Sequence, residues 1–259
     1  MKEKKKISFV FFIFTLLFFY LPLLVLVIYS FNEGKTMKWT GFSFHWYEEL
    51  FTRSKELWNA FENSIIIALL SSLASTVIGT LGAIGIYWYR FRHKKLIQTV
   101  SYLPLMLPDI IIGISLLIFF AGIGLNLSLT TIFIAHTTFN IPYVLFILIA
   151  RLQEFDYSVI EASYDLGAKE KDTLLKIILP IIKPGIIAGF LMAMTLSLDD
   201  FVITFFVSGP GSSTLPLHIF SMIRFGVSPV INALAVILIA ATAFLALLSK
   251  NMQKYIYQS

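Results

Sequence analysis

An all-α integral membrane protein is the fold class that the sequence predicts, and three observations support it. Of the 259 residues, 58% are hydrophobic and only 14% are charged, and the mean hydropathy is +0.83. The apolar residues gather into six runs of bilayer-spanning length. A charged segment, residues 151–184, separates the fourth run from the fifth. Such a chain cannot bury its apolar surface in one water-soluble core, so we expect lipid to solvate it.

Six transmembrane helices are predicted from these runs, because about 20 consecutive apolar residues span a bilayer as a helix. The first run is too long for a signal-peptide core and no small-residue cleavage pattern follows it, so we expect a retained helix. All six helices are expected to form one transmembrane domain, residues 1–259. The expected spans are 7–30, 64–87, 96–121, 129–150, 185–207 and 231–248.

The distribution of lysine and arginine predicts the orientation of these helices. The basic residues cluster on one side of the membrane, whereas the opposite loops are neutral, nearly uncharged or mixed in sign. The positive-inside rule makes the basic side cytoplasmic, so we expect both termini to lie inside. The basic segments are the N-terminal lysines, the loop 88–95, the segment 151–184, and Lys250 and Lys254.

The segment 151–184 is predicted to form a helix, a turn and a second helix along the cytoplasmic surface. Ser158, followed three residues later by Glu161, has the form of a capping box at the start of the first helix. Gly167 supplies the backbone freedom that a sharp turn needs.

The second helix of this segment is expected to carry an apolar face and to end at a proline. Leu174, Leu175 and Ile178 are predicted to share that face, and Pro180 to stop the helix. A two-helix unit with one apolar face suits a groove on another protein, whereas an ordinary amphipathic loop would lie on the lipid headgroups.

Catalytic and metal-binding motifs are missing from the sequence. There is no G-x-x-x-x-G-K-[ST] phosphate loop, and the nearest glycine-rich stretch, Gly209–Thr214, has no lysine. There is no cysteine, and the four histidines stand without carboxylates at ligand spacing, so no metal site is predicted. We expect His136 to form a hydrogen bond inside the fourth span. No catalytic residue, resident cofactor or nucleic-acid partner is expected.

Three carboxylates interrupt the apolar spans, although a charge at this depth costs about 3 kcal/mol or more. Asp109 lies in the third span, and Asp199 and Asp200 lie in the fifth. No lysine or arginine occurs within the six apolar runs. The charge is therefore met by a partner subunit, by water in a cavity, by protonation or by a cationic substrate.

Each candidate for the substrate path also has a structural interpretation. Asp109 follows Pro108 directly and is well placed to begin a new helix after Pro104 and Pro108 interrupt the third span. Asp199 and Asp200 are adjacent, hence about 100° apart on a helix, so they cannot both face one cavity squarely, and we expect one to line the path and the other to bond to a neighbouring helix. Asn140, in the fourth span, suits either substrate binding or a hydrogen bond between helices.

The segment Glu161–Pro180 resembles the loop that defines permease subunits of bacterial ABC importers. That loop is written E-A-A, three residues, G, nine residues, I-x-L-P. Ser163 stands where the second alanine is usual. The resemblance implies that the segment docks into an ATP-binding subunit, which uses ATP and Mg and is a separate chain. The matching residues are Glu161, Ala162, Gly167, Ile177, Leu179 and Pro180.

A narrower resemblance covers most of the chain. It is similar to spermidine/putrescine ABC transporter permeases of the binding-protein-dependent transport system inner membrane component family. The resemblance implies that the chain forms half of the translocation path for polyamines in a bacterial cell membrane. Transport along this path would occur by alternating access. The implied partners are a second homologous permease, two copies of the ATP-binding subunit and an extracytoplasmic polyamine-binding protein. The segments that carry it are Trp39–Phe51, Tyr102–Leu117, Leu196–Pro210 and Gly226–Ala235.

Other functions stay open. Related permeases carry ferric ion, sulfate or other small solutes, but the acidic spans favour a cation. A channel or secondary transporter would need no ATPase. An intramembrane serine protease would need a serine and a histidine, for which Ser115 and His136 are the available pair. The usual glycine after the serine is missing, and a protease leaves the segment 151–184 unexplained.

Overall fold

Helices make up nearly all of the secondary structure of the computed structural model, which describes residues 2–36, 38–154, 156–225 and 228–256. Within that part, the isolated β-bridge joins Asn32 and Phe42. The chain divides into two compact units, residues 1–56 with 219–259, and residues 57–218. Residue 155 of the segment 151–184, residues 226–227 of the Gly226–Ala235 match and the ends of the expected domain, 1 and 257–259, lie outside the described residues.

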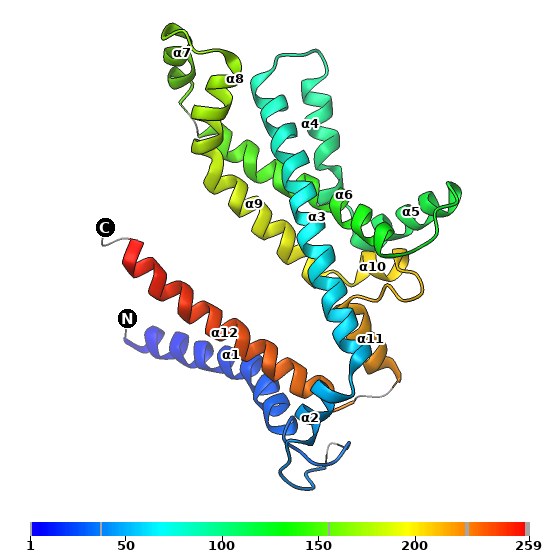
Figure 1. Cartoon of the computed structure of the whole chain (residues 1–259). Coiled ribbons are helices and arrows are strands. Elements are labelled where there is room, and N and C mark those ends of the chain that lie inside the picture. Colours follow the sequence, from blue (N-terminus) through cyan, green and yellow to red (C-terminus); the bar gives the residue numbers. More distant parts are fainter. Residues whose placement is uncertain (1, 37, 155, 226–227, 257–259) are drawn as a thin grey trace. The chain divides into compact units, whose positions relative to one another are not determined.

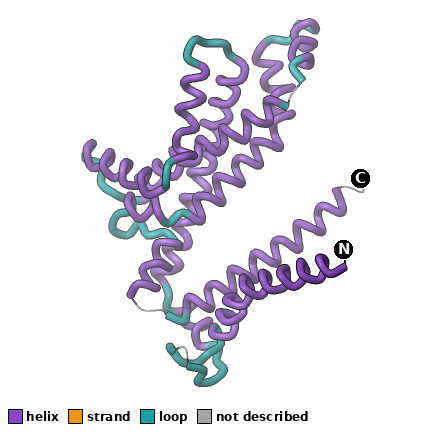
Figure 2. Tube along the Cα trace, turned by 180° about the vertical axis from the view of Figure 1, so that it is seen from behind, coloured by secondary structure: helices purple, strands orange, loops and turns teal. Residues whose placement is uncertain are grey.

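The first unit is built on a pair of long helices. Helix α1 (Lys2–Tyr29) and helix α12 (Val230–Ile256) lie side by side and run in opposite directions (Figures 1 and 2). The start of α1 and the end of α12 are therefore at the same end of the pair. This is the arrangement that termini on one side of a membrane require. Helix α2 (His45–Thr52) packs against α12.

The loop between α1 and α2 is organised around the buried Asn32. The Asn32 amide nitrogen donates to loop carbonyls, and its oxygen accepts from the Thr40 amide at 2.9 Å. The indole nitrogen of Trp46, whose residue is 2% exposed, donates to the Asn32 carbonyl at 2.6 Å. Trp46 therefore anchors this loop. The carbonyls that accept from the Asn32 amide belong to Gly34, Thr36 and Lys38.

Three long helices form the centre of the second unit. They are α3 (Lys55–Trp88), α6 (Leu129–Gln153) and α9 (Leu179–Asp199), and α6 packs along α9. Glycines allow close packing on both sides of α6, because a Cβ at Gly79 of α3 would lie 2.7 Å, and one at Gly189 of α9 would lie 3.2 Å, from the Val144 side chain of α6. Close packing through small residues is typical of membrane helices, which lack a hydrophobic drive to associate in lipid.

The expected third span is broken at its prolines. Helix α4 (Lys94–Tyr102) continues as a 3₁₀ turn, η1 (Leu103–Met106), and α5 (Asp109–Gly122) follows at a bend of 108°. Pro104 lies in the 3₁₀ turn and Pro108 directly precedes α5. The interruption by prolines is confirmed.

The expected fifth span, residues 185–207, is wrong as a continuous helix. Helix α9 ends at Asp199, the backbone is extended at Asp200, with ψ of 121°, and α10 (Val202–Val207) begins after the break. Residues of α9 and residues of α10 therefore do not share the faces that they would share on one continuous helix. The chain then reaches α11 (Leu215–Phe225), which crosses the boundary between the two units.

The multi-pass character of the chain is confirmed, although the number of crossings is not. Within the described residues, four helices are long and apolar enough to cross a membrane, and the bent α4–α5 segment makes a fifth if it is one span. In α12 the apolar stretch is shorter and covers residues 230–244. The four long helices are Lys6–Tyr29, Lys55–Trp88, Leu129–Gln153 and Glu170–Asp199.

Candidate functional site

The three intramembrane aspartates line one cavity of about 240 Å³ in the second unit. They arrive from separate elements, because Asp109 begins α5 while Asp199 and Asp200 flank the end of α9. Aromatic rings of α6 and of the break complete the wall. The lining residues are Asp109, Phe139, Tyr143, Thr195, Leu196, Asp199, Asp200, Phe201 and Val202.

Asp109 lies both at a helix start and at the cavity. It is the first residue of α5, with Pro108 as the residue before the helix, so its carboxylate lies at the positive end of the helix dipole. It also lines the cavity. A position at a helix start and a position in a substrate path are therefore compatible.

The expectation that one of Asp199 and Asp200 lines the cavity while the other bonds to a neighbouring helix is met in part: Asp199 is exposed, whereas Asp200 bonds to His136 of α6 and also lines the cavity. The expectation assumed a continuous helix, in which neighbours lie about 100° apart. The helix ends at Asp199, and the extended backbone at Asp200 changes the direction of the next side chain. Both residues consequently line the same cavity.

Asp200 is held by four hydrogen bonds inside the protein. Its Oδ1 accepts from the Ile203 amide at 3.2 Å, and its Oδ2 accepts from the amide and the hydroxyl of Thr204, both at 2.8 Å. The same Oδ2 lies 3.1 Å from His136 Nε2. Asp200 thus satisfies free amides at the start of α10, which is the function of a helix cap.

His136 supplies the internal partner that a search for lysine and arginine missed. Its ring is buried between α6, α9 and α10, with Nδ1 at 2.7 Å from Ser197 Oγ and Nε2 at 2.9 Å from Thr204 Oγ1. The expected hydrogen bond is present, but its partners lie outside the fourth span. A sequence signal existed, since His136, Asn140 and Tyr143 follow helical spacing on one apolar span.

Of the two roles predicted for Asn140, the structure shows the hydrogen bond between helices. It is fully buried, and its Nδ2 donates to the Ala193 carbonyl of α9 at 3.2 Å. It is not among the residues that line the carboxylate cavity. The bond joins α6 to α9, as polar side chains do between membrane helices.

The chemistry of the cavity suits an organic cation. Asp109 and Asp199 are exposed to it, and alkylammonium groups also bind the faces of aromatic rings such as Phe139 and Tyr143. In the described part of the chain, no group of three or more histidine, aspartate or glutamate side chains is placed to hold a metal ion.

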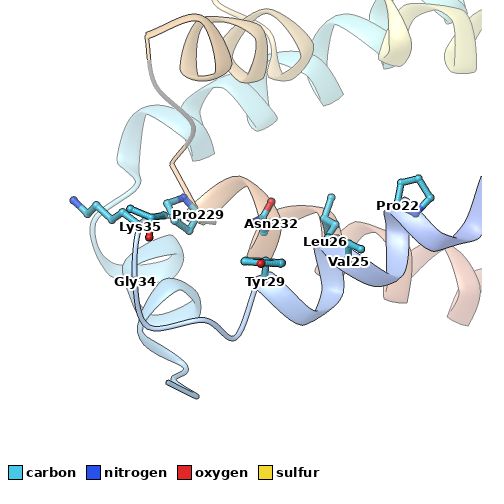
Figure 3. Close-up of a pocket in the computed structure, with 9 residues that line it drawn as sticks. Pro22, Val25, Leu26, Tyr29, Gly34, Lys35, Pro229 and Asn232 are labelled. Atoms are coloured by element: carbon cyan, nitrogen blue, oxygen red, sulfur yellow. The ribbon is translucent and has the colours of Figure 1, made fainter. Parts of the chain in front are cut away.

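A second cleft, of about 370 Å³, lies in the first unit (Figure 3). Figure 3 shows Tyr29 of α1 opposite Asn232 of α12, with Lys35 extending away from them. None of the sequence-predicted candidates lines it. The lining residues are Pro22, Val25, Leu26, Tyr29, Gly34, Lys35, Thr36, Pro229 and Asn232.

The segment 151–184 forms the expected hairpin, which lies before the start of α9 (Figure 1). Helix α7 (Ser158–Asp165) is followed by Gly167, whose φ of +82° is the left-handed conformation that glycine adopts readily. Helix α8 (Glu170–Thr173) then leads through a π-helical turn, η2 (Leu174–Ile178), into α9.

The predicted capping box at Ser158 and Glu161 is wrong. Ser158 is the first residue of α7, and the Ser158 amide donates to Asp156 Oδ1 at 2.9 Å. Asp156 therefore satisfies the helix start, in the local turn that aspartate favours. Hydrogen bonds from Ser158 hold the pKa of the Asp156 carboxyl below its usual value.

Pro180 does not stop the second helix, contrary to the prediction. It lies in the first turn of α9, directly after the π-helical turn, where a wider turn accommodates the missing amide hydrogen and the ring. The prediction that Leu174, Leu175 and Ile178 share one apolar face is also wrong for one of these residues. Ile178 is buried, Leu174 packs against the same core, and Leu175 is exposed.

Ser163 has a structural reason to replace the usual alanine. It is buried, and its hydroxyl contacts the Thr173 hydroxyl at 2.9 Å, which ties α7 to α8. Tyr89, after α3, donates to Glu170 at the start of α8, and this hydrogen bond raises the pKa of the Tyr89 phenol. The hairpin is thus fastened both internally and to α3.

The outer surface of the hairpin is free for contact with another protein. Glu161, Ala162 and Gly167 are exposed, and the Leu166 side chain beside the turn is 89% exposed. Of the remaining motif positions, Ile177 and Leu179 are half-buried and Pro180 is exposed. An exposed leucine at a helical turn offers an apolar anchor for a groove.

Sequence comparison relates the chain to transport permeases. A family described as binding-protein-dependent transport system inner membrane component matches residues 75–259. The spermidine/putrescine transport system permease protein PotC of Haemophilus influenzae is 42% identical over 234 residues, covering 90% of this chain and 91% of that protein. The putrescine transport system permease protein PotI of Escherichia coli is 41% identical over 240 residues, covering 90% and 85%.

Solved structures share the fold. A bacterial ABC transporter involved in the import of the acidic polysaccharide alginate has a chain with a TM-score of 0.74 and 15% identity, covering 96% of both chains. An inward-facing MetNI methionine ABC transporter has a chain with a TM-score of 0.57 and 17% identity, covering 75% of this chain and 91% of that one. At these identities the likeness concerns the fold alone.

Proposed function

Because the chain belongs to the family of binding-protein-dependent transport system inner membrane components, we propose that it is the permease subunit of an ATP-driven polyamine importer. The observation that supports this substrate most directly is that Asp109 and Asp199 are exposed at one cavity with aromatic walls, which Asp200 also lines. Spermidine and putrescine are flexible chains of ammonium groups, which carboxylates and aromatic faces both bind. The relatives named for spermidine and putrescine support the same substrates.

A cationic cargo is favoured over ferric ion, sulfate or another small solute. The related fold that imports an acidic polysaccharide indicates that the fold does not select the sign of the cargo. The side chains of the path select it. Three carboxylates would repel an anion, and the described residues offer no cluster for a metal ion.

The mechanism we propose is alternating access driven from the hairpin. Two copies of an ATP-binding subunit, which use ATP and Mg, grip the exposed hairpin surface of this chain and of a second homologous permease. An extracytoplasmic polyamine-binding protein delivers the substrate. ATP binding favours one orientation of the path over the other, as a ligand with different affinities for two states must. This chain performs no covalent step.

The topology that we propose has six spans of one transmembrane domain, with both termini and the hairpin in the cytoplasm of a bacterial cell and the domain in its inner membrane. The basic segments support this orientation through the positive-inside rule. The antiparallel α1 and α12 also support termini on one side. In this topology the α4–α5 segment crosses once despite its bend.

The decisive experiment is uptake into vesicles that contain all subunits. We expect labelled spermidine or putrescine to accumulate with the binding protein and ATP, and not without ATP. Sulfate and ferric ion should not compete. Uptake independent of the ATP-binding subunit would indicate a channel or secondary transporter, and competition by an anion would exclude the carboxylate cavity as the selective element.

A further inference from the structure

We propose that His136 is a positioning residue for the carboxylate cluster. Its imidazole holds Asp200 at the break between α9 and α10, so that Asp200 maintains the fold of the site and Asp199 remains available to a cation. The division of tasks between the two aspartates goes beyond the proposed function. It depends on that function only for the identity of the cation.

The first support is a chain of hydrogen bonds that ends at Asp200. Ser71 on α3 donates to Ser197 Oγ at 3.2 Å, and Ser197 lies 2.7 Å from His136 Nδ1. The Ser197 hydroxyl accepts from Ser71 and forms a hydrogen bond with Nδ1, which fixes the orientation of the imidazole ring. In this orientation Nε2 faces Asp200 Oδ2 at 3.1 Å, where a proton on Nε2 would be donated to the carboxylate.

The second support is the contrast between the two neighbouring carboxylates. The Asp200 side chain is 8% exposed and accepts four hydrogen bonds, while the His136 side chain is 2% exposed. Asp199 is exposed to the cavity, and no donor to its carboxylate exists among the described residues. The Asp200 carboxylate is thus already used by protein donors, whereas the Asp199 carboxylate is open to a cation.

The third support is the position of these bonds on the backbone. Asp200 caps the first amides of α10, and His136 secures the capping oxygen from α6. Removing a partner of a buried carboxylate is strongly unfavourable, because the charge is left with too few donors. Without the imidazole, we expect the break to relax and Asp199 to lose its direction toward the cavity.

Two substitutions at one position separate hydrogen bonding from packing. His136→Phe keeps a ring but has neither donor nor acceptor. His136→Gln keeps one acceptor for Ser197 and one donor for Asp200. In the reconstituted complex, we expect His136→Phe to lower the maximal rate of spermidine uptake by about tenfold, the size that loss of one charged hydrogen bond implies. His136→Gln should restore most of that rate.

A second measurement requires no transport. The chain contains no cysteine, so Thr195→Cys places a single thiol in the cavity wall. We expect the rate at which a positively charged thiol reagent modifies this residue to change in the His136→Phe background and to stay close to the unsubstituted rate with His136→Gln. Equal modification in all three backgrounds would overturn the proposal, even if the complex transports no polyamine.

Asp200 provides a third measurement if His136→Phe does not assemble. Asp200→Asn should lower the maximal uptake rate while leaving the half-saturating spermidine concentration nearly unchanged, since Asp200 does not bind the cation. A higher half-saturating concentration with an unchanged maximal rate would show that Asp200 is a substrate ligand. That result, or a His136→Gln variant as inactive as His136→Phe, contradicts the assignment.

Discussion

Asp109 and Asp199 are the residues on which cation binding depends in our proposal. Each faces the cavity, and no donor to either carboxylate exists among the residues that the structure describes. A carboxylate without protein donors is expected to bind water or an ammonium group. In this proposal, the sign and the place of these charges select the solutes that enter the path.

Asp199→Asn should raise the half-saturating spermidine concentration by about tenfold, because a charge-assisted hydrogen bond becomes a neutral one. Uptake titrations in vesicles measure this change. Asp199→Glu is the matched control, since it keeps the charge and should lie closer to the unsubstituted protein. An unchanged titration with Asp199→Asn would remove this residue from the substrate path.

Gly167 is the residue that forms the turn of the hairpin. A Cβ at Gly167 would meet no atom within 4 Å, so only the left-handed backbone, with φ of +82°, opposes substitution. Gly167→Val should cost about 1–2 kcal/mol at the turn and weaken ATP-driven uptake, whereas Gly167→Asn should be tolerated because asparagine visits this conformation.

The measurement for Gly167 is the amount of transport per ATP hydrolysed, together with the amount of complex in the membrane. We expect Gly167→Val to reduce the ratio while the chain stays in the membrane. Identical ratios for the valine and asparagine variants would mean that the turn conformation does not matter for coupling.

At the scale of elements, the segment after α10 approaches the loop before α6 at Gly209. A Cβ at this position would lie 1.9 Å from the Leu127 carbonyl oxygen, a backbone atom that cannot move aside alone. The Gly209 amide also donates to Ser212 Oγ at 2.7 Å. The close approach therefore needs glycine.

Gly209→Ala is expected to destabilise the protein by about 2 kcal/mol or more, in the range for overpacked sites. The midpoint of thermal unfolding of the purified protein should fall by several degrees. Gly122→Ala is the control, because a Cβ there meets no atom within 4 Å and the residue ends a helix. Equal midpoints for the two variants would show that the contact with Leu127 is not formed.

The elements themselves were predictable to different degrees. Runs of apolar residues located α3 and α6 well, because hydropathy depends on neighbours along the chain. The ends of helices were not predictable in the same way. Pro180 is accommodated by a π-helical turn, and α9 ends at Asp199 although apolar residues continue.

At the scale of the whole molecule, the two compact units share one membrane topology in our proposal. Single thiols can test it, because the chain has no cysteine. Ala168→Cys in the hairpin should react with a membrane-impermeant reagent only from the cytoplasmic side. Ser54→Cys, between α2 and α3, should react only from the outside. The reverse pattern, or equal reaction from both sides, would contradict the orientation with both termini inside.

The sequence by itself determined the membrane class, the position of the hairpin and the family, because composition, hydropathy and motif spacing are properties of the chain in order. Tertiary structure alone decided that Asp109, Asp199 and Asp200 share a cavity and that Asp200 is held by His136. The reason is distance along the chain. His136 and Asp200 are 64 residues apart in the chain, and they meet where α6 packs against the break between α9 and α10. No local pattern around Asp200 contains that partner.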